Sequence, residues 1–237
     1  MTQTVHKYSS PILNYLKDQY GLTLSDVLLD IGSSCGHFLS IASMYTTVLG
    51  IEIDPTTFAG SVLSALKVMK AVEYESRIVP LFGDAVQDFE NYLGAKYVYI
   101  FCYGFCPRNL KSVLSKVFQS ESVQWLILGL SEGELEDFGF TAENLQCSIT
   151  LKETIKNCPL VGSGEKKTLW IYKIDHRNKS TVTHLNPKFQ HALKLLKFTN
   201  ERKNYLHDYL ASSAIQWLQR HERPRKKVKI FVSHQSF

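Results

Sequence analysis

Apolar residues along the first part of the chain form short continuous runs that alternate with stretches of helical spacing. Five runs are bounded by glycine or polar residues, as is typical of parallel strands covered on both faces. These runs span residues 27–31, 48–53, 78–82, 97–102 and 123–130. Between them, apolar residues recur at intervals of three and four, which predicts helices over residues 36–45, 55–72 and 107–118. The order therefore predicts a parallel α/β sheet.

The two ends of this region add further elements. Residues 11–20 form an amphipathic pattern in which Pro11 would occupy the first helical turn. A short helix is predicted from about Val86, and an acidic loop and helix over residues 132–144. Two later runs, residues 147–155 and 168–174, are joined by a glycine turn at 162–164 and predict an antiparallel hairpin. The expected sheet thus has seven strands.

The most informative stretch, residues 27–54, joins a strand, a glycine turn, a helix and a second strand. Asp30 stands near the carboxyl end of the first strand, and Gly32 and Gly36 follow in the turn. In an open parallel sheet the carboxyl ends of the strands face the ligand crevice. These three residues are therefore candidate ligand-binding residues.

The turn reads D-x-G-x-S-x-G, with Ser34 between the two glycines. A dinucleotide-binding turn would read G-x-G-x-x-G and receive a pyrophosphate. The leading acid favours a positively charged ligand instead. Glu52 closes the second strand, about 20 residues on, where an acid would receive ribose hydroxyls. The competing interpretation is an ordinary strand-to-helix turn with a solvated Glu52.

Composition sets outer bounds on these expectations. The 237 residues suffice for one α/β domain and an appendage, and no apolar run is long enough to span a membrane. With no charged-then-apolar leader, an intracellular protein is expected. The five cysteines lack paired C-x-x-C spacing, which favours reduced core cysteines over a disulfide framework or a metal site.

Charge divides the chain into an acidic part, residues 1–175, and a basic extension, residues 176–237. The first part carries 14 Lys and Arg against 19 Asp and Glu, and the second 13 against 3. Apolar positions from 186 to 220 recur at near-helical intervals, so the extension should be helical. It ends in a block of six candidate nucleic-acid-binding residues. These are Arg220, Arg223, Arg225, Lys226, Lys227 and Lys229. Such a block can contact phosphates or act as a nuclear localisation signal, or it can be an idle solvated tail.

The acid-first turn with a second-strand acid resembles the S-adenosylmethionine loop of the Rossmann-like class I methyltransferases, D/E-x-G-x-G-x-G. Ser34 takes the place of the middle glycine. The resemblance implies that Asp30, Gly32, Ser34, Gly36 and Glu52 bind S-adenosylmethionine. It also implies that Asp84, just past the third strand, holds the adenine amino group, although Asp84 could equally cap the next helix.

Five motifs taken together are similar to the non-SET, disruptor-of-telomeric-silencing histone lysine methyltransferases. They are D-I-G-S-S-C-G, G-I-E, G-D, Y-I-F-C-Y-G-F and V-G-S-G-E-K-K-T-L-W-I-Y-K-I, between Val27 and Ile174. Three departures stand out. Tyr103 and Gly104 replace the two asparagines of N-N-F, Ala85 replaces an adenine-packing phenylalanine, and the N-terminal subdomain is reduced to residues 4–10, a candidate lid strand.

The resemblance implies a histone lysine methyltransferase whose substrate is nucleosomal and whose location is nuclear, with the cytoplasm as the alternative. Tyr103 and Phe105, after the central strand, are the candidate catalytic residues and would line an apolar channel for a neutral amine. This strand end lacks the acceptor side chain and the prolines typical of base-amine methyltransferases. An RNA methyltransferase and a catalytically silent nucleic-acid-binding fold are the alternatives. No membrane partner and no metal is expected.

Overall fold

The structure is a computed structural model, and it describes residues 2–71, 77–88, 94–102, 104–159 and 166–176. Within these ranges the chain forms one seven-stranded sheet with the order β3-β2-β1-β4-β5-β7-β6. The strands are β1 Val27–Ile31, β2 Thr47–Glu52, β3 Ile78–Phe82, β4 Tyr97–Ile100, β5 Trp125–Leu128, β6 Cys147–Pro159 and β7 Lys166–His176. The predicted α/β fold is confirmed.

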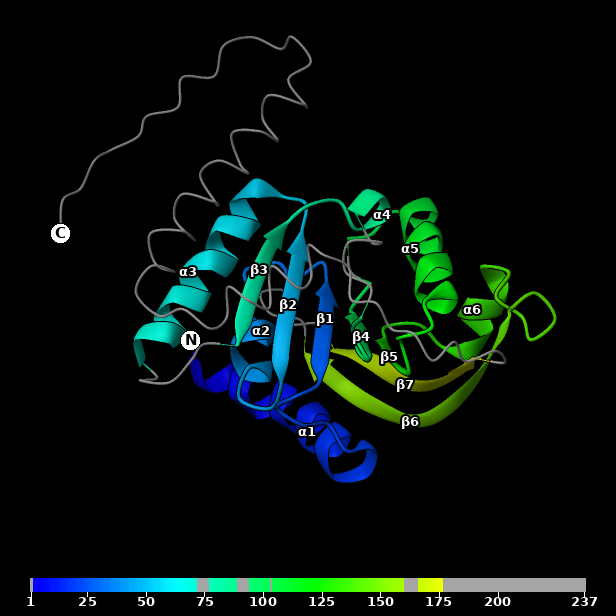
Figure 1. Ribbon diagram of the computed structural model, residues 1–237, viewed down its shortest axis with the longest axis horizontal. Helices are drawn as coiled ribbons and strands as arrows, with labels where there is room; N and C mark the ends of the chain where they lie inside the picture. Colours follow the sequence, from blue (N-terminus) through cyan, green and yellow to red (C-terminus); the bar gives the residue numbers. More distant parts are fainter. Residues whose placement is uncertain (1, 72–76, 89–93, 103, 160–165, 177–237) are drawn as a thin grey trace, which may run out of the picture.

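Five strands are parallel, and β7 and β6 close the sheet as an antiparallel pair. The strand order reverses at β1, whose neighbours are β2 and β4. The carboxyl ends of β1, β2 and β3 reach the same edge of the sheet, near α4 (Figure 1). In sheets of this kind, the crevice at the reversal point is where ligands bind.

Helices cover both faces of the sheet. They are α1 Thr2–Tyr20, α2 His37–Ala42, α3 Pro55–Ala71, α4 Ala85–Asp88, α5 Pro107–Gln119 and α6 Glu132–Asp137. One apolar cluster joins α1, α2 and α3 to one face, and the other joins α4, α5 and α6 to the opposite face (Figure 1). On α5, the buried residues recur at helical spacing and end at Phe118. The five parallel strands are therefore buried on both faces, as their continuous apolar runs predicted.

Two expectations for the N-terminus were wrong. Pro11 does not begin the first helix but lies inside α1, which starts at Thr2, and residues 4–10 are helical rather than a lid strand. Proline removes one backbone donor from a helix interior. The buried side chains of Ile12, Leu13 and Leu16 hold this helix against the sheet, so tertiary packing outweighs that local cost.

Several boundaries also shift. The central strand ends at Ile100 rather than at residue 102, because Cys102 adopts a left-handed backbone with φ of 66° that breaks the ladder. The hairpin strands are longer than predicted and contain two register shifts. The predicted turn at 162–164 lies outside the described residues, as does the basic extension of residues 176–237 apart from His176, the last residue of β7. No helix in the described part of the chain is long and apolar enough to cross a membrane.

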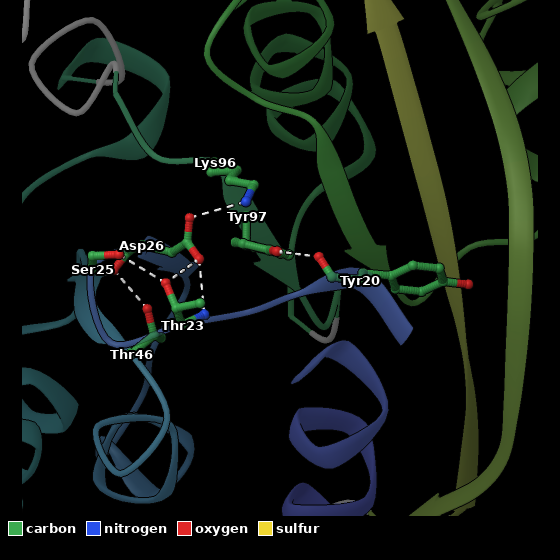
Figure 2. Close-up of polar contacts among 7 residues, drawn as sticks. All are labelled: Tyr20, Thr23, Ser25, Asp26, Thr46, Lys96 and Tyr97. Carbon is green, nitrogen blue, oxygen red and sulfur yellow. Dashed lines mark hydrogen bonds and ion pairs between the residues drawn. The ribbon is translucent and has the colours of Figure 1, made fainter. Parts of the chain in front are cut away.

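A polar cluster ties together the amino ends of β1, β2 and β4, opposite the ligand edge (Figure 2). The Asp26 carboxylate accepts hydrogen bonds from Thr23 N–H at 2.8 Å and from Lys96 Nζ at 3.0 Å. The Thr46 hydroxyl donates to the Asp26 carbonyl at 2.6 Å. The Tyr97 hydroxyl donates to the Tyr20 carbonyl at 3.0 Å, which fixes the end of α1. These hydrogen bonds hold the amino ends of the three strands together.

We expect Asp26→Asn to cost about 1 kcal/mol of stability at about pH 7, a value reduced for the partial solvent exposure of the Lys96 pair. Burial alone would raise the pKa of Asp26, but the Thr23 and Lys96 hydrogen bonds hold it below its usual value. A lowered folded-state pKa stabilises the protein above the unfolded pKa of about 3.9 and loses that contribution as pH falls through the folded value. Urea unfolding at several pH values should therefore show the gap between the two proteins closing in acid. A constant gap would contradict the ion-pair explanation.

Candidate functional site

The glycine turn after β1 has three residues with left-handed backbones. The φ angles are 78° at Gly32, 50° at Ser34 and 73° at Gly36. The N–H groups of Gly32 and Ser33 both donate to the Ile51 carbonyl, at 2.9 and 3.1 Å, which anchors the turn to β2. A left-handed conformation costs a non-glycine residue roughly 1–2 kcal/mol. Ser34 therefore carries strain at the position where the methyltransferase pattern has glycine.

Neighbouring groups approach the two glycines closely. A Cβ at Gly32 would lie 2.9 Å from Cε2 of Phe105, and one at Gly36 would lie 2.9 Å from the Ser61 Cα. The left-handed backbone favours glycine at both positions, and at Gly36 the close approach of the Ser61 backbone excludes a larger residue as well. The Phe105 ring lies against the turn, so the structure brings these two sequence-predicted site segments together.

Glu52 is 8% exposed and links the turn to the β2–α3 connection. Its Oε2 accepts from Ser34 N–H at 2.8 Å, and its Oε1 accepts from the N–H groups of Ile53 and Asp54 at 2.9 and 2.8 Å. A carboxylate offers about four acceptor positions. Three are used here, which fixes the carboxylate and leaves capacity for one more donor from a ligand.

Asp30 differs from Glu52 because burial dominates its environment. It is 2% exposed, and it lies beside Gly50 on β2 and Tyr99 on β4. Burial raises the pKa of Asp30 well above its usual value, and the nearby Glu52 carboxylate raises it further. Burial also raises the pKa of Tyr99, with a smaller contribution from Asp30. A cationic ligand group here would favour the charged form of Asp30.

Two further acids close the edge of the site at helix N-termini. Asp84 accepts from Val86 N–H at 2.8 Å, so it caps α4 as one of its two predicted roles requires. Asp54 accepts from the N–H groups of Thr56 and Thr57 at 3.0 and 2.8 Å. Chiefly through the Thr57 N–H, the pKa of Asp54 is held below its usual value.

These groups line one cavity of about 710 Å³ along the carboxyl edge of the sheet. The volume falls within the range typical of ligand pockets, about 300–1,000 Å³. Five of the six predicted cofactor-binding residues line it, namely Asp30, Gly32, Ser34, Glu52 and Asp84. Gly36 does not line it, although its neighbours Cys35 and His37 do.

The cavity wall contains four acids and, among the described residues, neither lysine nor arginine. Such a wall suits a cation better than a phosphate. Ile53 is 47% exposed and lines this cavity beside Asp54, so it offers an apolar surface to a ligand. No group of three or more His, Cys, Asp or Glu residues in the described ranges could hold a metal ion.

Of the two predicted catalytic residues, Phe105 lines the cavity and Tyr103 lies outside the described residues. The six basic residues of the extension, Arg220 to Lys229, also lie outside them. Three of the cysteines are not fully buried core residues as expected: Cys35 and Cys102 are partly buried, Cys106 is exposed, and all three line the cavity. Burial raises the pKa of Cys102 to about 12, so this thiol stays protonated at neutral pH.

Sequence reasoning missed six cavity residues from α1, α2, β4 and the hairpin, which we call the aromatic arm. They are Ile12, Phe38, Tyr99, Phe101, Cys158 and Leu169. All six belong to or pack against the apolar cluster on the α1 and α2 face. Only Tyr99 had a signal in the sequence, because two neighbouring parallel strands would place it beside Asp30. The others depend on long-range contacts.

In sequence, the chain matches no protein-family model and no curated protein. It is similar in structure to magnesium protoporphyrin IX methyltransferase from Synechocystis, solved with bound S-adenosylmethionine. The TM-score is 0.53 at 14% identity, over 73% of this chain and 78% of that one. It is also similar to the methyltransferase domain of bacterial CtHen1, with a TM-score of 0.51 at 11% identity, over 73% of this chain and 97% of that one.

A Pyrococcus horikoshii protein has a TM-score of 0.52 at 16% identity, over 73% of this chain, which spans only 64% of that protein. These likenesses and the strand order establish the Rossmann-like fold of the class I methyltransferases. The narrower resemblance to the disruptor-of-telomeric-silencing family gains no support from these three proteins.

Proposed function

We propose that the chain is an S-adenosylmethionine-dependent methyltransferase. The observation that carries the proposal is the acid-walled cavity at the strand reversal point, with a fixed Glu52 beside a left-handed glycine turn. Asp30 and Glu52 would face the cationic and ribose parts of the cofactor. Ile53 and Asp84 would flank its adenine. The methyltransferase fold supports this proposal, as does the absence of lysine and arginine from the described cavity wall.

Methyl transfer from S-adenosylmethionine needs few catalytic groups. The sulfonium of S-adenosylmethionine is a strong electrophile, so the main task is to align a nucleophile opposite the leaving sulfur. The incoming group donates an electron pair to the methyl carbon, and the carbon–sulfur bond breaks with its pair remaining on sulfur. The cavity residues would hold both partners in line and exclude water.

For the substrate, the sequence resemblance supports a lysine of a histone on nucleosomes. The amine would have to arrive neutral, and an apolar channel that includes Tyr103 and Phe105 would favour the uncharged form. RNA is the alternative substrate, since the basic extension suits any polyanion. A silent fold that only binds nucleic acid would bind a polyanion without transferring a methyl group.

Tritiated S-adenosylmethionine offered with nucleosomes, free histones, RNA and DNA separates these candidates. The proposal predicts binding of the cofactor and transfer of label to one of the four substrates. Cofactor binding without transfer to any of these four substrates would favour the silent fold or an acceptor that is none of the four. Failure to bind the cofactor would contradict the proposal itself.

We expect truncation after Leu218 to abolish nucleic-acid binding and leave S-adenosylmethionine affinity unchanged. Residues 1–175 carry a net charge of −5 and residues 176–237 one of +10, so the extension should supply most of the attraction. Binding of the full chain should weaken steeply with salt, because each neutralised phosphate releases a counterion.

Filter binding of RNA and DNA over a salt series compares the nucleic-acid affinities of the full chain and the truncated protein. Retained, salt-sensitive binding by the truncated protein would refute a substrate-docking role for the basic block.

We also propose a nuclear location, with the cytoplasm as the alternative. If truncation abolished only nuclear import, the block would be an address signal.

A further inference from the structure

The aromatic arm of the cavity consists of six side chains that carry no ionic charge. Ile12 comes from α1, Phe38 from α2, Tyr99 from β4, and Cys158 and Leu169 from the closing hairpin. Phe101 follows β4. Four of the six are buried. A permanently charged acceptor group in this arm would lose its hydration without gaining a fixed countercharge there, which costs several kcal/mol per ion.

Aromatic rings give the arm a defined shape. Phe38 and Tyr99 are in direct stacking contact, with centroids 4.0 Å apart and an interplanar angle of 13°. Tyr99 and Phe101 are also within 13° of parallel, but their centroids are 6.4 Å apart. Both rings line the cavity, and a flat ring stacked between them would need roughly 7 Å between their planes. Such a ring can enter there if the half-buried Phe101 side chain turns away from Tyr99.

The arm also limits the chemistry of the nucleophile. Its two polar groups are the Tyr99 hydroxyl and the Cys158 thiol, and burial raises the pKa of each. Both stay protonated at neutral pH. Asp30 is next to Tyr99 in the sheet, but its carboxylate would face the positive charge of the bound cofactor, which lowers its basicity. The described arm therefore offers no strong base, and an acceptor there must present a lone pair without first losing a proton.

We propose that the acceptor is an uncharged heteroaromatic ring with a pyridine-type nitrogen, stacked on Tyr99 and Phe101. This inference rests on the proposed methyltransferase function and deepens it, and for the acceptor it replaces the histone lysine that the sequence resemblance supports. The ring-nitrogen lone pair forms the nitrogen–methyl bond, while the carbon–sulfur bond breaks with its electron pair going to sulfur. The products are S-adenosylhomocysteine and a methylated ring that has taken over the positive charge.

The rings of the arm offset part of the cost of the positive charge on the product. A cationic ring over an aromatic face gains a cation–π attraction, strongest where water is excluded. The four acids elsewhere on the cavity wall add a favourable field. The ring can belong to an unpaired nucleobase of RNA or DNA or to a free small molecule, because both present the same flat surface and the same kind of nitrogen.

Two sets of probes test the inference. Transfer from tritiated S-adenosylmethionine is measured to unstructured RNA and DNA oligonucleotides, to adenosine and cytidine, to quinoline, and to nucleosomes and free histones. Naphthalene, the carbon isostere of quinoline, is the matched control that can stack but has no nucleophile. Binding of nucleosides, quinoline and naphthalene in the presence of saturating S-adenosylhomocysteine is followed by saturation-transfer NMR.

We expect ring probes to bind the S-adenosylhomocysteine complex and at least one nitrogen-containing ring to be methylated on a ring nitrogen. Label in the oligonucleotides or nucleosides assigns the ring to a nucleobase, and label in quinoline alone assigns it to a small molecule. If the cofactor binds but no ring probe binds, or only histone lysine is labelled, the inference is overturned while the methyltransferase proposal stands. If the cofactor does not bind, the proposed function fails instead.

Substitutions at the arm give a second readout. Phe101→Leu should raise the KM for the ring acceptor about tenfold, as expected for loss of one stacking contact, with S-adenosylmethionine affinity within about twofold. Phe101→Tyr should restore the KM. Phe118→Leu, a matched loss of a buried ring in the other apolar cluster, should lower stability and leave the KM unchanged. Equal KM values for Phe101→Leu and the wild type would contradict stacking on Phe101.

Discussion

Replacing Gly36 with alanine is expected to lower the free energy of unfolding by about 2–5 kcal/mol and to abolish measurable S-adenosylmethionine binding. The left-handed backbone costs alanine about 1–2 kcal/mol, and overpacking against Ser61 costs about 1–3 kcal/mol more. The new methyl carbon would lie 2.9 Å from the Ser61 Cα and 2.7 Å from its Oγ, so the α3 backbone must move. Urea unfolding and calorimetry measure the two effects.

Two other glycines separate the causes. Gly21 has a φ of 66° but no atom within 4 Å of an added Cβ, so Gly21→Ala should cost only the conformational part. Gly133, in α6, has neither constraint, so Gly133→Ala should be neutral or slightly stabilising. If Gly36→Ala cost no more than Gly21→Ala, the close approach of α3 to the turn would be wrong.

Glu52→Ala is expected to weaken S-adenosylmethionine binding by about 1.5–3 kcal/mol, roughly 10- to 150-fold in Kd. The substitution removes the acceptor for a ligand hydroxyl. It also releases three backbone N–H groups, those of Ser34, Ile53 and Asp54, and so loosens the turn that forms the site. Most of the loss should appear in affinity, measured by calorimetry on protein shown to be folded.

Glu143→Ala is the matched control, because Glu143 is an exposed acid far along the chain from the glycine turn and outside the cavity wall. Its affinity should equal that of the wild type. Unchanged affinity in Glu52→Ala, with a wild type that binds, would remove Glu52 from the cofactor site.

The strands could be predicted because burial on both faces leaves a continuous apolar run, and the bounds of β3 were predicted without error. Local rules failed where long-range contacts decide the outcome. Pro11 marked a helix start by propensity, yet packing of α1 against the sheet carries the helix through it. The apolar run predicts a strand at Cys102, and a cysteine gives no local signal for the left-handed backbone that the structure has there.

The cofactor side of the site was predictable because it lies within a short stretch of sequence. Asp30, the turn and Glu52 are linked by a single strand-helix-strand unit, and their meeting follows from the parallel pairing of β1 with β2. The aromatic arm is assembled from four elements far apart in the chain. Ile12 and Leu169 meet there only through the final fold, so no local pattern could identify them as cavity residues.

Calorimetric titration of S-adenosylmethionine into the wild-type protein, with NAD⁺ titrated in parallel, tests the central claim most directly. The acid-first turn and the acid-walled cavity predict saturable one-to-one binding of S-adenosylmethionine and no binding of the dinucleotide. Binding of NAD⁺ without binding of S-adenosylmethionine would contradict the account.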